Sequence, residues 1–237
     1  MVIEMRRVRD FIYKLLIPRT PYIRYKSKLL NQDMILLQPD YWVEIFTHTG
    51  IYEKEVTQYI LTHGPYDAAI DVGANCGYYT VLLSRLSQKV YAFEPDPRTF
   101  RALLENTKHF DNVQLSRVAA GDAFVNNKPF SQTPSHGSSG MHNLVDDSNV
   151  ISVSVRRLDD VIPTGTKVDL MKIDVEGHEA AVLKGSRRIR DENPDMKIIC
   201  ETKLSTIYDV CKVLEEYERQ QLNEGNIVFV RNQYFGD

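Results

Sequence analysis

The pattern of apolar and polar positions is most informative between residues 68 and 86. An apolar run at residues 68–70 is typical of a buried strand, and apolar positions from Tyr78 to Leu86 recur with the period of a helix. Between them lies the segment DVGANCGYYT, residues 71–80, which contains two glycines. This stretch predicts a strand, a tight glycine turn and a helix.

The same pattern predicts strands and helices in alternation along the rest of the chain. Strands are expected at residues 35–37, 89–93, 113–119, 151–155, 168–174 and 196–200, and a closing hairpin at 220–222 and 227–230. Helices are expected at residues 51–61 and 207–216, and a further helix is expected to end near Leu183. Another helix is expected to begin after Asp96, with Phe100, Leu103 and Leu104 facing inward. This order predicts an α/β fold, a three-layer sandwich around a mostly parallel sheet with a C-terminal antiparallel hairpin.

Composition narrows the class of protein. A chain of 237 residues suits one large α/β domain better than two, and its net charge of −3 argues against a non-specific nucleic-acid binder. Cys76, Cys200 and Cys211 are odd in number and lack C-x-x-C spacing, so neither a disulfide framework nor a zinc site is expected. No apolar run approaches the roughly 20 residues that cross a bilayer, and no signal-peptide cleavage pattern is present. A cytoplasmic location is therefore expected.

The first segment differs from the rest in charge. Residues 1–28 carry a net charge of +6, which leaves −9 for the remainder. Apolar positions from Met5 to Leu15 recur at helical spacing until Pro18, so residues 1–17 are predicted to form a basic amphipathic helix. Such a helix can lie on an anionic inner membrane surface as a peripheral contact, or its apolar face can pack on the domain or on a second subunit. We expect residues 1–49 to form a basic helical extension and residues 50–237 to form the domain.

The glycine spacing distinguishes between two classes of cofactor. The pattern is Asp71-x-Gly73-x-x-x-Gly77, with Asn75 where a dinucleotide-binding turn has its middle glycine, so a pyrophosphate is disfavoured. Gly73 and Gly77 would leave bare backbone for a nucleotide-like ligand. Glu94 follows the next strand, and a carboxylate at that place can accept both hydroxyls of a ribose.

Three further segments are candidates for ligand contact. Asp122 follows the strand at residues 113–119 and either accepts the adenine amino group or caps the next turn. Residues 123–150 are polar and are predicted to form a substrate-facing loop, in which His136 and His142 are either functional or exposed histidines without a role. Tyr52 and Glu53 could reach the cofactor, although a solvated helix face also explains Glu53.

A second group of ionisable residues follows the strand at residues 168–174. Asp174, Glu176, His178 and Glu179 lie within six residues at the carboxyl end of that strand, and a helix follows that ends at Gly185. Doubly wound sheets bind their ligands at the carboxyl ends of strands. This group is therefore the candidate for chemistry.

In these motifs the chain resembles the FkbM family of S-adenosylmethionine (SAM)-dependent methyltransferases. The resemblance covers about residues 50–202 and is carried, in order, by DVGANCGYYT, VYAFEPDPRTF, AAGD, RRLDDV and KIDVEGHEAAVLKG. It implies a class I, Rossmann-like fold with a seven-stranded sheet, SAM as cofactor and S-adenosylhomocysteine as product. It also implies methyl transfer to a hydroxyl of a sugar, a glycolipid or a polyketide-like acceptor.

The resemblance further implies a role for each motif residue. Glu94 would bind the ribose of SAM and Asp122 would lie by the adenine. The methionine part would be surrounded by the turn residues Asp71, Gly73, Ala74, Asn75 and Gly77. The transferring methyl would lie beside the catalytic candidates His178, Asp174 and Glu176, of which Asp174 is expected to contact the cofactor as well.

The expected reaction is an in-line displacement at the sulfonium methyl, in which a base takes the proton of the acceptor hydroxyl. His178 is the first candidate for the base and Asp174 the second, but His178 could instead only hydrogen-bond to Glu179 or Asp174. A metal held by Asp174, Glu176 and His178 is an alternative, yet one short stretch rarely supplies a full site, so no metal is expected.

Two other functions remain open. A methyltransferase acting on nitrogen of protein or RNA would use the same cofactor but commonly shows an Asn-Pro-Pro-Tyr-like sequence, where this chain has DVEG. A non-catalytic SAM-binding interaction protein is the other alternative. The expected partner is a small-molecule or lipid-linked glycan acceptor, and no nucleic acid.

Overall fold

The structure is a computed structural model that describes residues 22–37, 41–132 and 150–232. The predicted helix at residues 1–17 and the loop histidines His136 and His142 lie outside these residues. Within them, no helix is long and apolar enough to cross a membrane.

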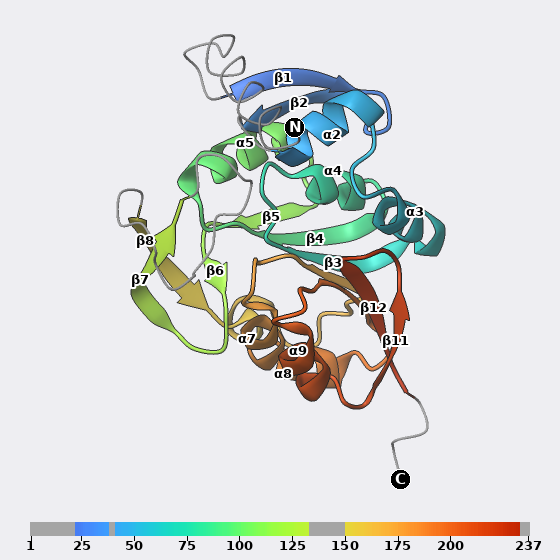
Figure 1. Ribbon diagram of the computed structural model, residues 1–237, viewed down its shortest axis with the longest axis vertical. Helices are drawn as coiled ribbons and strands as arrows, with labels where there is room; N and C mark the ends of the chain where they lie inside the picture. Colours follow the sequence, from blue (N-terminus) through green and yellow to red (C-terminus); the bar gives the residue numbers. More distant parts are fainter. Residues whose placement is uncertain (1–21, 38–40, 133–149, 233–237) are drawn as a thin grey trace, which may run out of the picture.

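A seven-stranded sheet forms the centre of the molecule (Figure 1). Its order is β11 (Tyr217–Gln221), β12 (Asn226–Arg231), β10 (Lys197–Glu201), β9 (Leu170–Ile173), β3 (Tyr66–Val72), β4 (Ser87–Phe93) and β5 (Val113–Ser116). Strands β10, β9, β3, β4 and β5 pair in parallel, whereas β12 is antiparallel to both β10 and β11. The predicted mostly parallel sheet with a C-terminal antiparallel hairpin is confirmed.

Helices cover both faces of this sheet (Figure 1). One face carries α2 (Tyr41–Thr49), α3 (Lys54–His63), α4 (Tyr78–Ser84) and α5 (Pro97–Thr107), and the other carries α6 (Leu158–Val161), α7 (Glu179–Lys184), α8 (Arg187–Glu192) and α9 (Ile207–Val213). Strand residues alternate between two apolar cores, because successive side chains point to opposite faces. Leu170 and Ile199 join the core with α3 and α4, whereas Met171 and Ile198 join the core with α7 and α9.

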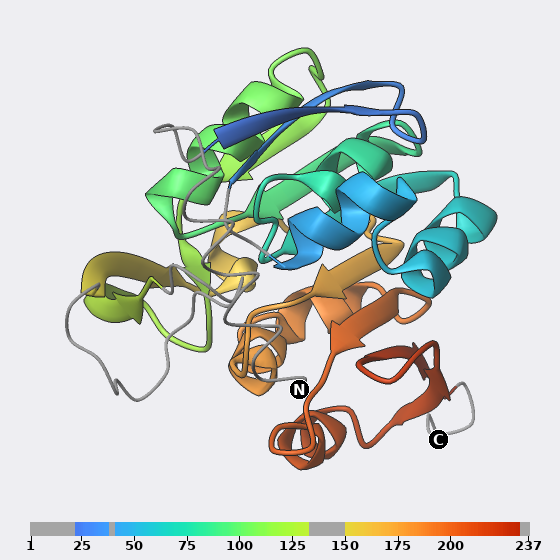
Figure 2. The same ribbon diagram turned by 45° about the horizontal axis from the view of Figure 1, so that its top comes forward.

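The described residues before α3 pack into the same apolar core as α3 and α4. Residues 22–37 form an antiparallel hairpin, β1 (Tyr22–Ser27) and β2 (Gln32–Leu37), rather than a helix. The hairpin lies alongside α5 (Figure 2), and Leu36 and Phe46 are fully buried in the same core as Ile60 of α3. The predicted helical extension is therefore wrong for residues 22–37, and the domain boundary at residue 49 stays a prediction.

Asn106 of α5 links this hairpin to the glycine turn. Its side-chain amide donates to the carbonyl oxygens of Ile35 and Cys76, at 2.7 Å each, and its side-chain oxygen accepts from the backbone N–H of Ile35 at 2.6 Å. Asn106 is 3% exposed. One buried side chain thus satisfies three backbone groups from two separate segments.

Three details of the predicted elements were wrong. The strand expected at residues 113–119 is divided, because β6 (Ala119–Ala120) pairs with β8 (Val150–Arg156) in a second, three-stranded sheet. The first part of the predicted loop at 123–150 is a strand, β7 (Val125–Ser131), which also pairs with β8. Leu104 is 49% exposed, because α5 turns Ala102, Leu103 and Asn106 inward instead.

The three bonds of Asn106 generate a stability prediction. Asn106→Ala should lower the free energy of unfolding by about 2 kcal/mol or more, because a buried backbone group without a partner costs roughly 1–3 kcal/mol. Leu104→Ala on the exposed side of the same helix should change it by about 0.5 kcal/mol at most. Urea unfolding measures both, and equal costs would show that the hairpin is not fastened through Asn106.

Candidate active site

The glycine turn after β3 is shaped by contacts within the protein. Gly73, Asn75 and Gly77 have φ of 81°, 51° and 91°, which is left-handed backbone that favours glycine. A Cβ on Gly73 would lie 1.8 Å from the backbone oxygen of Asp174, and one on Gly77 would lie 2.7 Å from Leu103. We predicted that these glycines leave room for a ligand. The structure gives a different reason for glycine at these two positions, because the backbone after β9 and the helix α5 fill the space that a Cβ would occupy.

Glu94 fastens this turn to the neighbouring strand end. One carboxyl oxygen accepts from the backbone N–H of Asn75 and the other from that of Asp96, both at 2.8 Å. The side chain is 6% exposed, and burial raises the pKa of Glu94 to about 7 even though the two backbone bonds favour the charged form. Glu94 therefore changes charge near neutral pH, directly beside the turn.

Asp71 lies behind the turn. It has no exposed surface, and its Oδ2 accepts from the hydroxyl of Thr80 at 2.6 Å. Burial raises the pKa of Asp71, while Lys172, its cross-strand partner on β9, acts in the opposite direction. This position suits a residue that holds the turn in shape from inside the domain.

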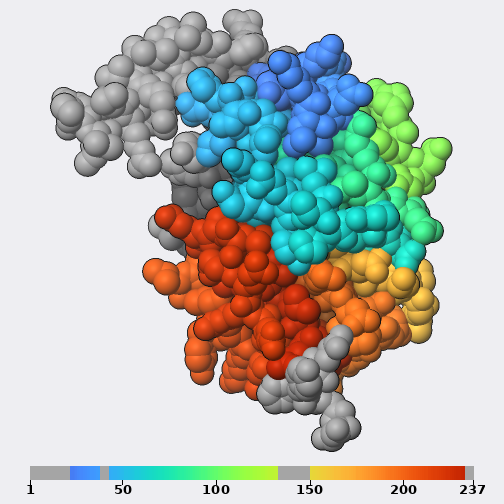
Figure 3. Space-filling view, turned by 90° about the vertical axis from the view of Figure 1, so that its right-hand side faces the viewer, coloured from blue at the N-terminus to red at the C-terminus, as the bar shows by residue number. Residues whose placement is uncertain are grey.

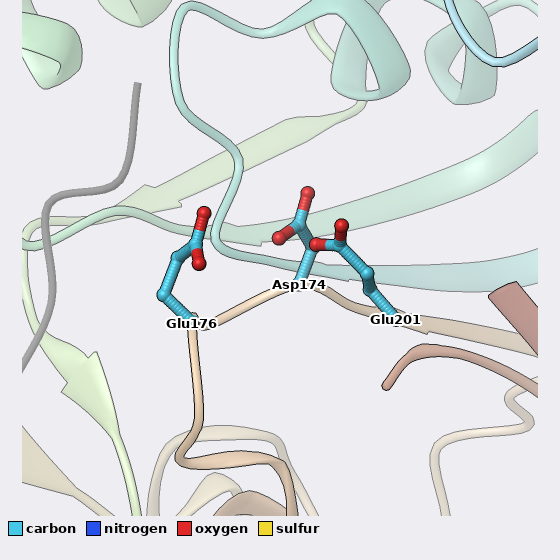
Figure 4. Close-up of side chains that lie close together, drawn as sticks. All are labelled: Asp174, Glu176 and Glu201. Atoms are coloured by element: carbon cyan, nitrogen blue, oxygen red, sulfur yellow. The ribbon is translucent and has the colours of Figure 1, made fainter. Parts of the chain in front are cut away.

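Three carboxyl groups gather beside the turn (Figure 4). Oxygens of Asp174, Glu176 and Glu201 lie within 4.8 Å of one another, and the side chains of Asp174 and Glu201 point toward each other from neighbouring strand ends. Two ammonium groups balance this charge. Lys172 donates to Oδ2 of Asp174 at 2.9 Å, and Lys203 pairs with Glu176. Because two of the three carboxylates already have a counter-ion from the chain itself, we assign no metal to them.

The two facing carboxyls have opposite pKa shifts. The negative charge and the hydrogen bond of Asp174 raise the pKa of Glu201 to about 10, so Glu201 holds a proton at neutral pH. Burial alone would raise the pKa of Asp174, but the ammonium of Lys172 and the bond from Glu201 lower it below its ordinary value. One ionised and one neutral carboxyl thus face each other, and Asp174 remains 21% exposed.

The pleat of the sheet explains why these residues meet. In a strand, every second side chain points to the same face. Lys172 shares its face with Leu170, and Glu201 shares its face with Ile199, which places both on the side of α3 and α4. Asp71 lies opposite Lys172, and Glu201 lies opposite Asn226 of β12. The polar groups of the site therefore form rows across neighbouring strands on one face at their carboxyl ends.

A second set of contacts closes the site on the side of α3. Tyr79 donates to one carboxyl oxygen of Glu53 at 2.7 Å, and Asn226 donates to the other at 2.6 Å. Glu53 has a left-handed φ of 41°. The C-terminal strands, in red, border the cyan segment of α3 in the space-filling view (Figure 3). Glu53 thus joins the segment before β3 to the last strand of the sheet.

His178 and Glu179 begin the helix after the acidic loop. His178 occupies the N-cap position of α7 but forms no side-chain capping bond, and it is half-buried. Glu179 is buried and accepts from the backbone N–H of Gly177 at 2.7 Å. Among the described residues, the carboxyl groups that lie close together are those of Asp174, Glu176 and Glu201, and neither His178 nor Glu179 belongs to this group. The base role of His178 stays a prediction.

Asp122 does not directly follow a strand of the main sheet, as was expected. It follows β6 of the small sheet and is exposed. It lines a charged hollow with Arg157, Lys184 and Arg187. The adenine role of Asp122 stays a prediction, and its premise of one continuous third strand of the main sheet was wrong.

The prediction from sequence missed the roles of Lys172, Glu201 and the pair Tyr79 and Asn226. A usable signal was present for two of them. Lys172 interrupts the buried run LMKI of β9, and Glu201 ends the next buried strand as Asp174 follows its own. A lysine inside a buried strand requires a partner, and a carboxylate two residues further on lies on the same face.

Comparison with known proteins identifies the relatives of this chain. The family model described as the methyltransferase FkbM domain matches residues 71–227. The chain is 28% identical over 141 residues to the hexuronic acid methyltransferase AglP of Haloferax volcanii, a match that covers 56% of each chain. It is 29% identical over 189 residues to the 2-O-methyltransferase NoeI of Sinorhizobium fredii, covering 70% of each. The chain thus spans little more than half the length of the first relative.

A solved structure supports the fold. The FkbM methyltransferase of Methylobacillus flagellatus superimposes with a TM-score of 0.50 at 17% identity, over 69% of this chain and 43% of that chain. Together with the strand order, this likeness shows the class I methyltransferase fold.

The contact between Gly73 and Asp174 generates a prediction with a matched control. Gly165 is also left-handed, at φ 76°, but a Cβ there would meet nothing within 4 Å. Gly165→Ala should cost about 1 kcal/mol of unfolding free energy for backbone strain alone. Gly73→Ala should cost about 3 kcal/mol or more, because overpacking adds to that strain. Urea unfolding of the two variants decides, and similar losses would mean that the strand ends can separate freely.

Proposed function

Because the chain belongs to the FkbM methyltransferase family, we propose that it transfers the methyl group of SAM to a hydroxyl oxygen of a sugar-type acceptor. One relative is named for a hexuronic acid and another for a 2-O position, which supports a hydroxyl acceptor. The observation that carries the proposal is the close approach of Gly73 to the backbone of Asp174, because it brings the residue with the ionised carboxylate next to the glycine turn.

The charge of the site fits a cationic cofactor. Asp174, Glu176 and Glu201 crowd the edge next to the turn, and Glu94 adds a fourth carboxyl group. Lys172 and Lys203 balance the charges of Asp174 and Glu176, but the carboxylate oxygens still offer hydrogen-bond acceptors to an ammonium group and give a pyrophosphate no donor. When bound, SAM supplies a methyl group already activated by the positive sulfur. The Gly73–Gly77 turn would hold its methionine part, and Glu94 would accept the ribose hydroxyls.

Asp174 is the proton acceptor that the geometry favours. It is ionised and partly exposed, and Lys172 fixes one of its oxygens. The acceptor hydroxyl gives its proton to Asp174 as its oxygen gains the methyl group. A positioned base of this kind contributes about 10² to 10⁴ in rate. His178, which begins the next helix, is the second candidate and would act from the α7 side.

Cofactor binding tests the first half of the proposal. Calorimetric titration should show binding of SAM and S-adenosylhomocysteine but not of NAD. Because Glu94 loses its proton as the pH rises through about 7, the affinity for SAM should rise about tenfold between pH 6 and pH 8, following the ionised fraction. Glu94→Gln should bind more weakly and without this pH dependence. Failure of the folded protein to bind either sulfur compound would contradict a SAM enzyme.

Methyl transfer tests the second half. Radiolabelled SAM is offered with a panel of methyl glycosides that includes a hexuronate. Asp174→Asn should reduce turnover by about 10² or more, because the base is lost, and Asp67→Asn, a carboxylate at the other end of β3, should not change it. If His178→Ala alone abolishes turnover and Asp174→Asn does not, the base is His178. If the wild type binds SAM but methylates no glycoside, the acceptor class is wrong.

A further inference from the structure

Lys172 is the least expected residue of the central sheet. It is 2% exposed, and on the same face it lies among apolar residues such as Leu170 and Ile199 and opposite the buried carboxyl of Asp71. Burying an ammonium group is costly unless it is paired, and apolar residues of similar volume often serve stability equally well. The packing of the sheet therefore does not account for a lysine at this position.

The side chains around Lys172 hold its ammonium group in a fixed position. Its Nζ lies 2.9 Å from Oδ2 of Asp174 and 4.6 Å from the centre of the Tyr79 ring. Tyr79 is itself held by its hydroxyl bond to Glu53. Aromatic faces attract cations, so the ring holds the ammonium from the side of α4 while Asp174 receives its hydrogen bond. The carboxylates of Asp174, Glu53 and Asp71 raise the pKa of Lys172 above its ordinary value despite burial, and it stays charged.

We propose that Lys172 is a positioning residue for methyl transfer, which keeps Asp174 ionised and fixes its carboxylate toward the acceptor hydroxyl. The inference rests on the proposed function of Asp174 as the proton acceptor. It assigns a separate task to each side chain: Asp174 receives the proton, and Lys172 acts only through Asp174.

Asp174 faces charged groups from every neighbouring element, so the effect of Lys172 has to be weighed against theirs. The acidic groups are Asp71 of β3, Glu176 of the following loop, Glu179 of α7 and Glu201 of β10, and the second cation is Lys203. Tyr52 and Cys200 also interact electrostatically with Asp174, and both are neutral because burial raises the pKa of each. Glu201 is neutral as well. Lys172 is the buried one of the two cations, at 2% exposure against 49% for Lys203, and is screened least.

The test compares the titration of Asp174 in three variants by carbon-13 NMR of aspartate carboxyls. The Asp174 signal is identified by its absence in Asp174→Asn. In Lys172→Met, the apparent pKa of Asp174 should rise by about one to three pH units, the usual effect of losing an adjacent cation. Lys172→Arg should titrate close to the wild type. Lys167→Met removes a lysine that is paired with Asp67 at the amino end of β3, away from the site, and should leave the Asp174 signal unchanged.

Turnover provides the readout that a merely structural lysine would not change. In Lys172→Met the acid limb of the pH profile of kcat/KM should move to higher pH by the same number of pH units as the pKa of Asp174. At pH values below the new limb, kcat/KM should be tenfold lower than in the wild type for each pH unit of displacement. Lys172→Arg should restore the acid limb. A uniform loss at all pH values, with the limb in place, would overturn the proposal.

The remaining outcomes are also decisive. An unchanged Asp174 titration in folded Lys172→Met overturns the proposal whatever the activity. If Lys172→Met does not fold, the wild-type ammonium signal of Lys172 in nitrogen-15 NMR should shift with the same midpoint as the Asp174 carboxyl, and a signal insensitive to that midpoint overturns it. If the wild type methylates no acceptor, the proposed function fails, while the titrations still show whether Lys172 controls the charge of Asp174.

Discussion

The close approach of the ends of β3 and β9 is the constraint on which the site depends. Gly73 lies against the backbone of Asp174 with no room for a side chain between them. Two parallel strands joined in register from Ala69 with Leu170 to Val72 with Ile173 deliver their following loops to one place. The glycine turn of one loop and the acidic residues of the other are therefore a single site, although about a hundred residues separate them in sequence.

That approach creates an electrostatic problem, which the surrounding residues solve in two ways. Asp71 and Asp174 flank Lys172, so one buried ammonium serves two strand ends. Glu201 retains a proton instead of adding a further charge, and Lys203 balances Glu176 at the rim. The result is a site in which Asp174 is an ionised, partly exposed carboxylate among several acidic side chains.

Much of this could be predicted from sequence, since the signals were local. The strand, turn and helix around residues 71–80, the strand before Asp174 and the C-terminal hairpin all followed from apolar periodicity. A strand was expected at residues 35–37, but its pairing in the hairpin of residues 22–37 was missed, because the hairpin packs on α5, some seventy residues later, where Asn106 fastens it. β7 was missed because its strand VNNKPFS is largely exposed and polar, and only pairing with β8 orders it. Leu104 was misplaced because the buried face of α5 is formed by Ala102, Leu103 and Asn106, which leaves Leu104 on the exposed side.

For the site, the single-strand motif identified Asp174 but not the residues that set its charge. Those residues come from different strands and share only the face of the sheet to which they point. Counting alternate positions back from Asp174 reaches Lys172, and counting from Ile199 reaches Glu201. The same face brings in Asn226 of β12, which holds Glu53 from the segment before β3. A substitution at Glu53 or at Asn226 would therefore disturb the centre of the domain. This contact explains why the C-terminal hairpin, although far from the glycine turn in sequence, lies beside the same site.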